Sequence, residues 1–114
     1  MHESGLTEDL FTHVLHHAHD ANARRVTQVK VVIGALSDAT PDSIRFYFES
    51  LAPGTIAEGA LLVFGTAPGR ARCTACGRDV TVGELYAPCP ACGELALSVT
   101  GGNAVYLDSL DVET

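Results

Sequence analysis

The chain has 114 residues, which is the usual length of one compact domain. Apolar residues make up 46% and charged residues 18%, as in a folded globular protein and unlike a disordered one. The net charge of −7 argues against nucleic-acid binding, which needs clustered Lys and Arg. No apolar run reaches the ~18 residues that cross a bilayer. The N-terminus lacks the basic start and apolar stretch of a signal peptide, so we expect a cytoplasmic protein without a membrane partner.

The first predicted element is an amphipathic helix over residues 6–22. Its apolar side chains recur at helical spacing in one broad stripe, which consists of Leu6, Leu10, Phe11, Val14, Leu15, Ala18 and Ala21. Thr7 is the expected N-cap and Asn22 the expected stop. Gly5 costs ~1 kcal/mol inside a helix, which favours a helix that begins after it.

The following elements are three strands and a second helix. A β-branched run predicts a strand over 26–33. Thr40 as N-cap, with a proline next to it, predicts a helix over 41–51. An apolar run and an alternating stretch predict strands over 60–66 and 103–112.

Between the last two strands lies a segment of different character, residues 68–100, which we interpret as a small inserted module. It contains two CxxC motifs, each followed by glycine and separated by twelve residues: Cys73, Cys76, Cys89 and Cys92. Four thiolates at this spacing can close a tetrahedral shell around Zn²⁺ at ~2.3 Å per bond. Such a shell leaves no open position for water, so we expect the zinc to be structural and not catalytic.

Other uses of the cysteines are less favoured but remain open. Structural disulfides are rare in a reducing compartment. Two matched pairs favour metal ligation over a redox CxxC, because the surrounding pattern is not a βαβ unit. An iron–sulfur cluster is the remaining alternative among metal sites.

The extreme N-terminus, Met1-His2-Glu3, offers a second kind of metal chemistry. The α-amine, the backbone nitrogen of residue 2 and the His2 imidazole can present nitrogen ligands in one plane, which suits Ni(II) or Cu(II). Glu3 can add a carboxylate or adjust the local charge. Taken alone, the motif is weak evidence, and the alternative is a solvated terminus with an incidental histidine.

Histidines also cluster on the polar face of the first predicted helix. His13 and His17 lie one turn apart, Asp9 precedes His13 by one turn, and His16 pairs with Asp20 at the same offset. Two imidazoles at this spacing can chelate a transition metal. The alternatives are a docking surface or a solvated face with local Asp–His pairs.

Several short stretches of the chain occur together in one known family. They are Met1-His2-Glu3, Ile33-Gly34-Ala35-Leu36-Ser37, Ile44-Arg45-Phe46-Tyr47-Phe48-Glu49, Pro68-Gly69-Arg70-Ala71-Arg72-Cys73 and Cys89-Pro90-Ala91-Cys92-Gly93. With these stretches, over about residues 1–113, the chain resembles the HypA/HybF family of hydrogenase-maturation nickel-insertion proteins. An N-terminal Met-His-Glu and a late pair of CxxC motifs rarely coincide by chance. The departures, Ser4-Gly5 and Ala35, remove no nickel ligand.

The resemblance implies an α+β fold, in which two helices pack on a three-stranded sheet and a small β-hairpin, zinc-ribbon-like module is inserted. The nickel-binding domain is then 1–67 plus 101–114, and the zinc-binding module is 68–100. In the family, nickel is bound at the N-terminus by His2, the terminal amine of Met1 and local backbone nitrogens.

The resemblance also implies partners. Members pass nickel toward the [NiFe] hydrogenase large subunit precursor together with the partner GTPase HypB, and some also serve urease and its accessory proteins. We therefore expect a metallochaperone with structural Zn²⁺ and transient Ni²⁺. We find no Gly-rich phosphate loop, no Ser–His–Asp order and no open zinc site, so the sequence does not favour an enzyme. A zinc-ribbon interaction or regulatory module is the alternative function, but it leaves Met1-His2-Glu3 without a role.

Overall fold

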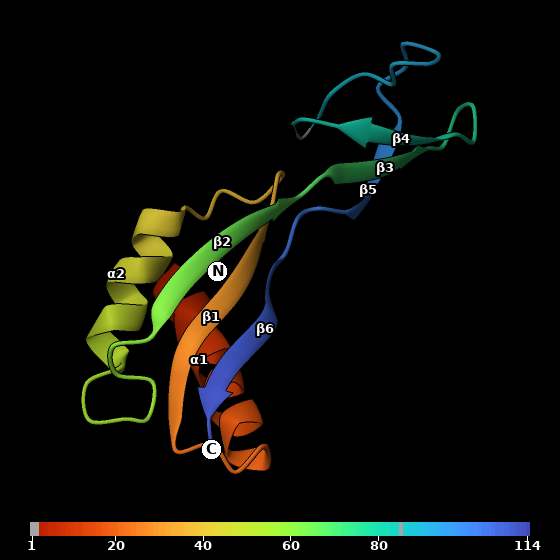
Figure 1. Cartoon of the computed structure of the whole chain (residues 1–114). Coiled ribbons are helices and arrows are strands. Elements are labelled where there is room, and N and C mark those ends of the chain that lie inside the picture. The colour runs from red at the N-terminus through yellow and green to blue at the C-terminus, as the bar shows by residue number, and fades with distance from the viewer. Residues whose placement is uncertain (1–2, 85) are drawn as a thin grey trace. The chain divides into compact units, whose positions relative to one another are not determined.

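The computed structural model describes residues 3–84 and 86–114. The elements follow in the order α1 (Glu3–Asp20), β1 (Arg25–Gly34), α2 (Pro41–Leu51), β2 (Leu61–Ala67), β3 (Gly69–Cys73), β4 (Asp79–Val82), β5 (Leu97–Gly101) and β6 (Val105–Glu113) (Figure 1). Across the described ranges, neither helix combines the length and apolarity needed to cross a membrane.

The chain forms two compact units. One consists of the described residues up to Val32, together with Ala39–Gly65 and Val105–Thr114. The other consists of Ile33–Asp38 and Thr66–Ala104. The segment 33–38 therefore packs with the cysteine-containing part, which its position in the sequence did not indicate. The assignment of nickel binding to 1–67 plus 101–114 and of zinc binding to 68–100 stays a prediction.

The first unit is built on the sheet β2-β1-β6, with α1 packed against α2 and against β6 (Figure 1). Its core consists mainly of side chains from α1, β1 and α2, which are Leu10, Phe11, Val14, Ala18, Val26, Val29, Val31, Ile44 and Phe48. The rings of Phe11 and Phe48 meet edge to face, with centroids 5.1 Å apart. Two helices on a three-stranded sheet, as expected from the resemblance, are confirmed.

The start of α2 follows the local sequence signals. Thr40 has the extended backbone of an N-cap, and its hydroxyl oxygen accepts a hydrogen bond from the Ser43 N–H at 3.2 Å. Pro41 occupies the first turn, where a missing N–H costs nothing. The predicted helix over 41–51 is confirmed at both ends.

The start of α1 differs from the prediction. The helix begins at Glu3, includes Gly5, and ends at Asp20. Thr7 is not the N-cap: it lies inside the helix, fully buried, and its hydroxyl donates to the Glu3 carbonyl at 2.6 Å. Burial of the apolar face outweighs the ~1 kcal/mol cost of an interior glycine. Asn22, with φ of 54°, follows the helix end as expected.

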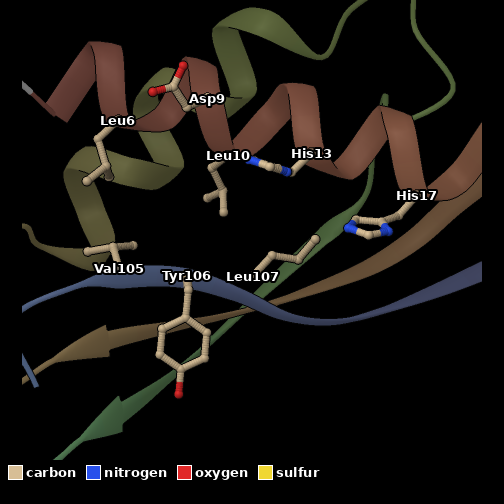
Figure 2. Close-up of a pocket in the computed structure, with 8 residues that line it drawn as sticks. All are labelled: Leu6, Asp9, Leu10, His13, His17, Val105, Tyr106 and Leu107. Atoms are coloured by element: carbon tan, nitrogen blue, oxygen red, sulfur yellow. The ribbon is translucent and has the colours of Figure 1, made fainter. Parts of the chain in front are cut away.

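The sheet strands of this unit match the predicted ones with shifts of one or two residues at their ends, which is ordinary fraying. Among the described strands, β6 pairs with β1 alone and is therefore an edge strand. On its helix-facing side, Val105 and Leu107 point toward Leu6 and Leu10 of α1 (Figure 2).

The second unit is a smaller antiparallel sheet with the order β4-β3-β5. Among the described residues, its buried apolar cluster consists of Leu36, Ala71 and Val82, with Val80 and Leu97 packed against them. A core of this size contributes little apolar burial, so the unit needs another source of stability.

Close backbone approaches in this unit require glycine. The Leu36 N–H donates to the Gly102 carbonyl at 2.8 Å, which brings two chain segments together without side chains between them. A Cβ at Gly34 would overlap with the Gly102 carbonyl, and one at Gly102 would overlap with Pro68. Gly102 also has φ of +78°, which side chains rarely adopt.

We expect Gly34→Ala to lower the free energy of unfolding by about 1–3 kcal/mol, because the new methyl group must displace backbone atoms. Gly65→Ala, in β2, is the control, since its Cβ would lie 3.7 Å from the Lys30 side chain, an ordinary contact. Urea unfolding of the metal-loaded protein, followed by far-ultraviolet circular dichroism, measures both. Equal stability of the two variants would contradict the close crossing.

Candidate metal centre

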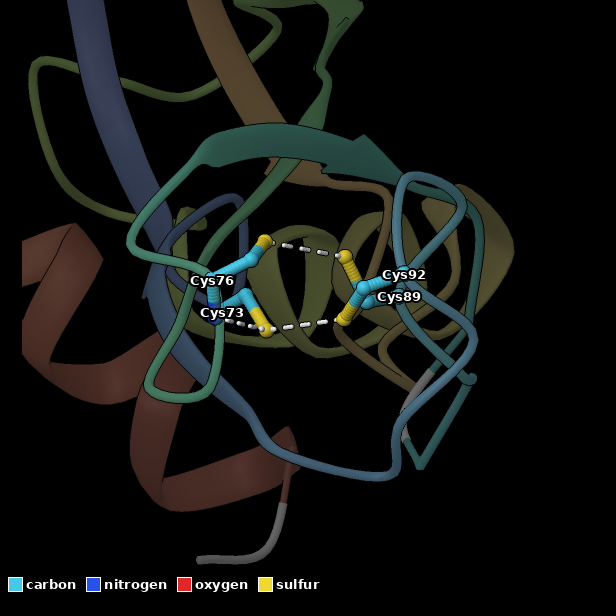
Figure 3. A group of neighbouring side chains, drawn as sticks. All are labelled: Cys73, Cys76, Cys89 and Cys92. Carbon is cyan, nitrogen blue, oxygen red and sulfur yellow. Dashed lines mark hydrogen bonds between the residues drawn. The ribbon is translucent and has the colours of Figure 1, made fainter.

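The four cysteines converge on one point in the second unit (Figure 3). Their Sγ atoms all lie within 4.8 Å of one another. The Cys73–Cys92 pair is separated by 3.7 Å and the Cys76–Cys89 pair by 3.9 Å. A disulfide requires ~2.05 Å, whereas four sulfurs at ~2.3 Å from one ion lie ~3.8 Å apart along each edge of the tetrahedron. The sulfur spacing therefore fits a tetrahedral metal ion.

The two CxxC motifs adopt equivalent turns. The Gly77 N–H donates to the Cys73 carbonyl at 2.8 Å, and the Gly93 N–H donates to the Cys89 carbonyl at 2.7 Å. Both glycines have left-handed backbones, with φ of 77° and 79°. This conformation turns the chain tightly after the second cysteine and lets both sulfurs of a pair face the same point.

Neighbouring elements hold the two turns. β3 ends at Cys73, so the first turn continues directly from a paired strand. The N–H and the hydroxyl of Thr74 both donate to the Ala96 carbonyl, at 2.9 and 3.0 Å. The first cysteine of each pair, Cys73 and Cys89, is buried, and the second is exposed. The cluster therefore has a protected side and a solvent-facing side.

Two of the thiols have pKa values shifted in opposite directions. The Cys76 N–H, 3.4 Å from the Cys73 sulfur, stabilises the thiolate and lowers the pKa of Cys73 to about 7. The Glu94 N–H also favours the Cys92 thiolate, but desolvation and the neighbouring sulfurs outweigh it and raise the pKa of Cys92 to about 12. Metal ions bind the thiolate form of cysteine, so a divalent cation displaces the protons of any cysteine that is still a thiol when it binds.

Of the N-terminal candidates, Met1 and His2 lie outside the described residues. Glu3 is the first residue of α1, and its Oε2 atom is buried without a hydrogen-bond partner among the described residues. A carboxylate oxygen in this state is an acceptor available to a neighbouring donor or cation.

The histidines of α1 have different surroundings. His16 pairs with Asp20, its Nε2 atom 3.3 Å from the carboxylate, as expected from their spacing. His13 and His17 instead line a groove beside β6. Within the described ranges, only the four cysteines form a group of three or more ligating side chains close enough to hold one ion as they stand.

Comparison of the sequence with known proteins points to one family. A family described as "HypA: Hydrogenase/urease nickel incorporation, metallochaperone, hypA" matches residues 1–112. The chain is 40% identical over 113 residues to hydrogenase maturation factor HypA 2 of Bradyrhizobium diazoefficiens, which covers 99% of this chain and 100% of that protein. It is also 40% identical, with the same coverage, to hydrogenase maturation factor HypA of Geobacter metallireducens.

The fold also matches solved structures. The solution structure of the Ni metallochaperone HypA from Helicobacter pylori superposes with a TM-score of 0.77 at 24% identity, and covers 99% of this chain and 98% of that one. A second solution structure, of HypA protein, matches with a TM-score of 0.74 at 24% identity, and covers 98% of this chain and 96% of that one. At this identity the likeness shows that the fold is shared.

The first cysteine motif needs the left-handed backbone of Gly77, and a substitution tests this requirement. We expect Gly77→Ala to lower the free energy of unfolding by ~1 kcal/mol or more and to weaken metal retention, because alanine disfavours positive φ. Gly83→Ala is the matched control, since its Cβ also meets open space but its backbone is not left-handed. Thermal unfolding and metal release to a chelator report both effects. Equal metal release from the two variants would contradict a requirement for the left-handed conformation at Gly77.

Removal of a cluster ligand tests the centre itself. We expect Cys73→Ala or Cys92→Ala to lose the bound metal and to destabilise the second unit by more than ~3 kcal/mol, because its apolar core is small. Thr81→Ala, at an exposed position of β4, is the control. Metal content by atomic spectroscopy and the Tm are the measurements. Unchanged metal stoichiometry and Tm in the cysteine variants would contradict a structural role.

Proposed function

The chain belongs to the HypA family of nickel-incorporation metallochaperones, and we propose that it binds Ni²⁺ through its first residues while Zn²⁺ in the four-cysteine cluster stabilises the second unit. The protein acts in hydrogenase maturation as a metallochaperone and not as an enzyme. The observation that carries the proposal is the four-cysteine cluster, whose complete set of sulfur ligands leaves Met1-His2-Glu3 as the motif available for an exchangeable cation.

Zinc is the proposed occupant of the cluster because of the donor set. Four thiolates select soft or borderline ions, and a tetrahedral S₄ site is typical of zinc or of iron–sulfur chemistry. The sulfur separations of 3.7 and 3.9 Å support a single ion. Zinc has no redox chemistry and a full shell admits no water, so the ion would act only on stability.

Nickel is the proposed cargo of Met1-His2-Glu3. The free α-amine of Met1, the backbone nitrogen of His2 and the His2 imidazole supply nitrogen ligands that suit planar Ni²⁺. The unpartnered Glu3 oxygen lies directly after these ligands in the chain and supplies a negative charge beside the cation. We assign His2 the principal role and Glu3 a supporting one.

Few ligands at a chain end also suit delivery. A cation held by a few nitrogens with open coordination positions exchanges readily to a recipient, whereas a complete thiolate shell leaves no open position for the recipient's ligand. Within the hydrogenase maturation machinery, we propose a HypB-type GTPase and the [NiFe] hydrogenase large subunit precursor as partners, in the cytoplasm. The alternative of a zinc-ribbon interaction module accounts for the cysteines but not for the N-terminus.

The N-terminal site is tested with untagged, zinc-loaded protein. We expect His2→Ala to weaken tight Ni²⁺ binding by more than about 100-fold, which corresponds to ~3 kcal/mol, because the imidazole is lost. One added residue before Met1 moves the α-amine away from the other ligands and weakens binding as well. Isothermal titration calorimetry measures the affinity, and absorption spectra distinguish planar from octahedral coordination.

His16→Ala is the control for this experiment, because His16 is exposed and paired with Asp20. It leaves both nickel affinity and zinc content unchanged. Wild-type nickel affinity in the His2→Ala protein would rule out the proposed site. Loss of zinc in that protein would instead show that the two metal sites are not independent.

A further inference from the structure

A groove of about 400 Å³ lies between α1 and β6 in the first unit (Figure 2). Its apolar lining comes from both elements, and its carboxylate and two imidazoles come from α1. The lining residues are Leu6, Asp9, Leu10, His13, His17, Val105, Tyr106 and Leu107. The two histidines are exposed at its edge, above the apolar side chains. The groove thus places two metal-ligating groups where solvent reaches them from one side.

The two imidazoles occupy successive turns of the helix. Their ring centroids are 6.4 Å apart and their planes differ by 23°, so the rings lie nearly parallel on the same side of α1 (Figure 2). Among the described residues, no carboxylate forms an ion pair with either ring, in contrast to His16 with Asp20. Both rings therefore keep their nitrogen atoms available.

We propose that His13 and His17 chelate one divalent transition-metal ion, which gives α1 a second and weaker nickel site. Exposed side chains can change rotamer at low cost, and a modest rotation brings one nitrogen of each ring to a common ion. Neutral imidazole is a ligand that suits Ni²⁺. Two ligands leave coordination positions for water, so the ion is held loosely and exchanges readily.

The other groups in the groove contribute less directly. The Asp9 carboxylate is turned away from the two rings (Figure 2), so it adds negative charge near the cation but is not assigned as a ligand. Leu10 and Leu107 limit the approach of water from the groove side. The net charge of −7 further favours cation approach.

The proposed site lies on the helix that directly follows the proposed N-terminal nickel ligands. The choice of nickel as its ion rests on the proposed function. Glu3 begins the helix and His13 follows ten residues later, roughly 15 Å along the axis at ~1.5 Å per residue. A weak site at this distance from the N-terminal ligands serves as a holding position for a nickel ion that enters or leaves the chain.

The test uses the His2→Ala protein, so that the N-terminal site does not mask the second one. Zinc-loaded protein is titrated with nickel chloride alone, in a buffer that does not bind the metal. We expect one weak Ni²⁺ per chain. His13→Gln or His17→Gln, added to His2→Ala, weakens this binding at least tenfold, whereas His16→Gln changes it less than twofold. Glutamine preserves helix propensity, and circular dichroism checks the fold of each variant.

A second readout identifies the ligands without mutation of the groove. Paramagnetic Ni²⁺ broadens the ring proton signals of His13 and His17 at lower metal ratios than those of His16 and His19. Equal broadening of all four histidines, or equal affinity of the His13→Gln and His16→Gln proteins, would overturn the proposal. A failure of the N-terminal proposal is seen separately, as tight nickel binding that survives His2→Ala.

Discussion

Four sulfur atoms lie at tetrahedral spacing in a unit whose buried apolar cluster, among the described residues, consists of Leu36, Ala71 and Val82, and in our proposal a metal ion bound by them stabilises this unit. A core of this size leaves the second sheet with little apolar burial to offset its conformational entropy. In our proposal the CxxC turns add the missing stability, because one ion bound to Cys73, Cys76, Cys89 and Cys92 would cross-link segments far apart in the sequence. The close backbone crossings at Gly34 and Gly102 add a second constraint in the same unit.

In the proposed function, the chain binds a permanent metal and an exchangeable one through different ligand types. Thiolates in a complete shell give a closed site that is suited to structure. In our proposals, nitrogen ligands at Met1 and His2, and at His13 and His17, give open sites that exchange their ion. Both roles are needed in a metallochaperone, because the scaffold must persist while the cargo is transferred. The acidic charge favours cations in general and leaves selection to the ligands.

α1 packs into the core with one face and presents histidines on the other, because helical periodicity places the two sets of residues on different sides. One face buries Leu10, Phe11 and Val14 in the core of the first unit. The other face presents histidines, two of which lie over the groove beside β6, while His16 is paired with Asp20. Because residues four apart share a face, one helix can anchor the core and carry ligands without conflict.

Local signals were enough to predict α2 over Pro41–Leu51, with Thr40 as its N-cap, and both cysteine motifs, because a cap, a proline and a CxxC spacing act within a few residues. Tertiary packing decided the rest. Burial of Thr7 moved the start of α1 back to Glu3, and the segment 33–38 joined the cysteine-containing unit through the Leu36 core. The sequence also did not predict that His13 and His17 line one groove together with residues of β6. Contacts between residues about ninety positions apart in the sequence depend on how helices pack on sheets, and a local sequence pattern does not specify such contacts.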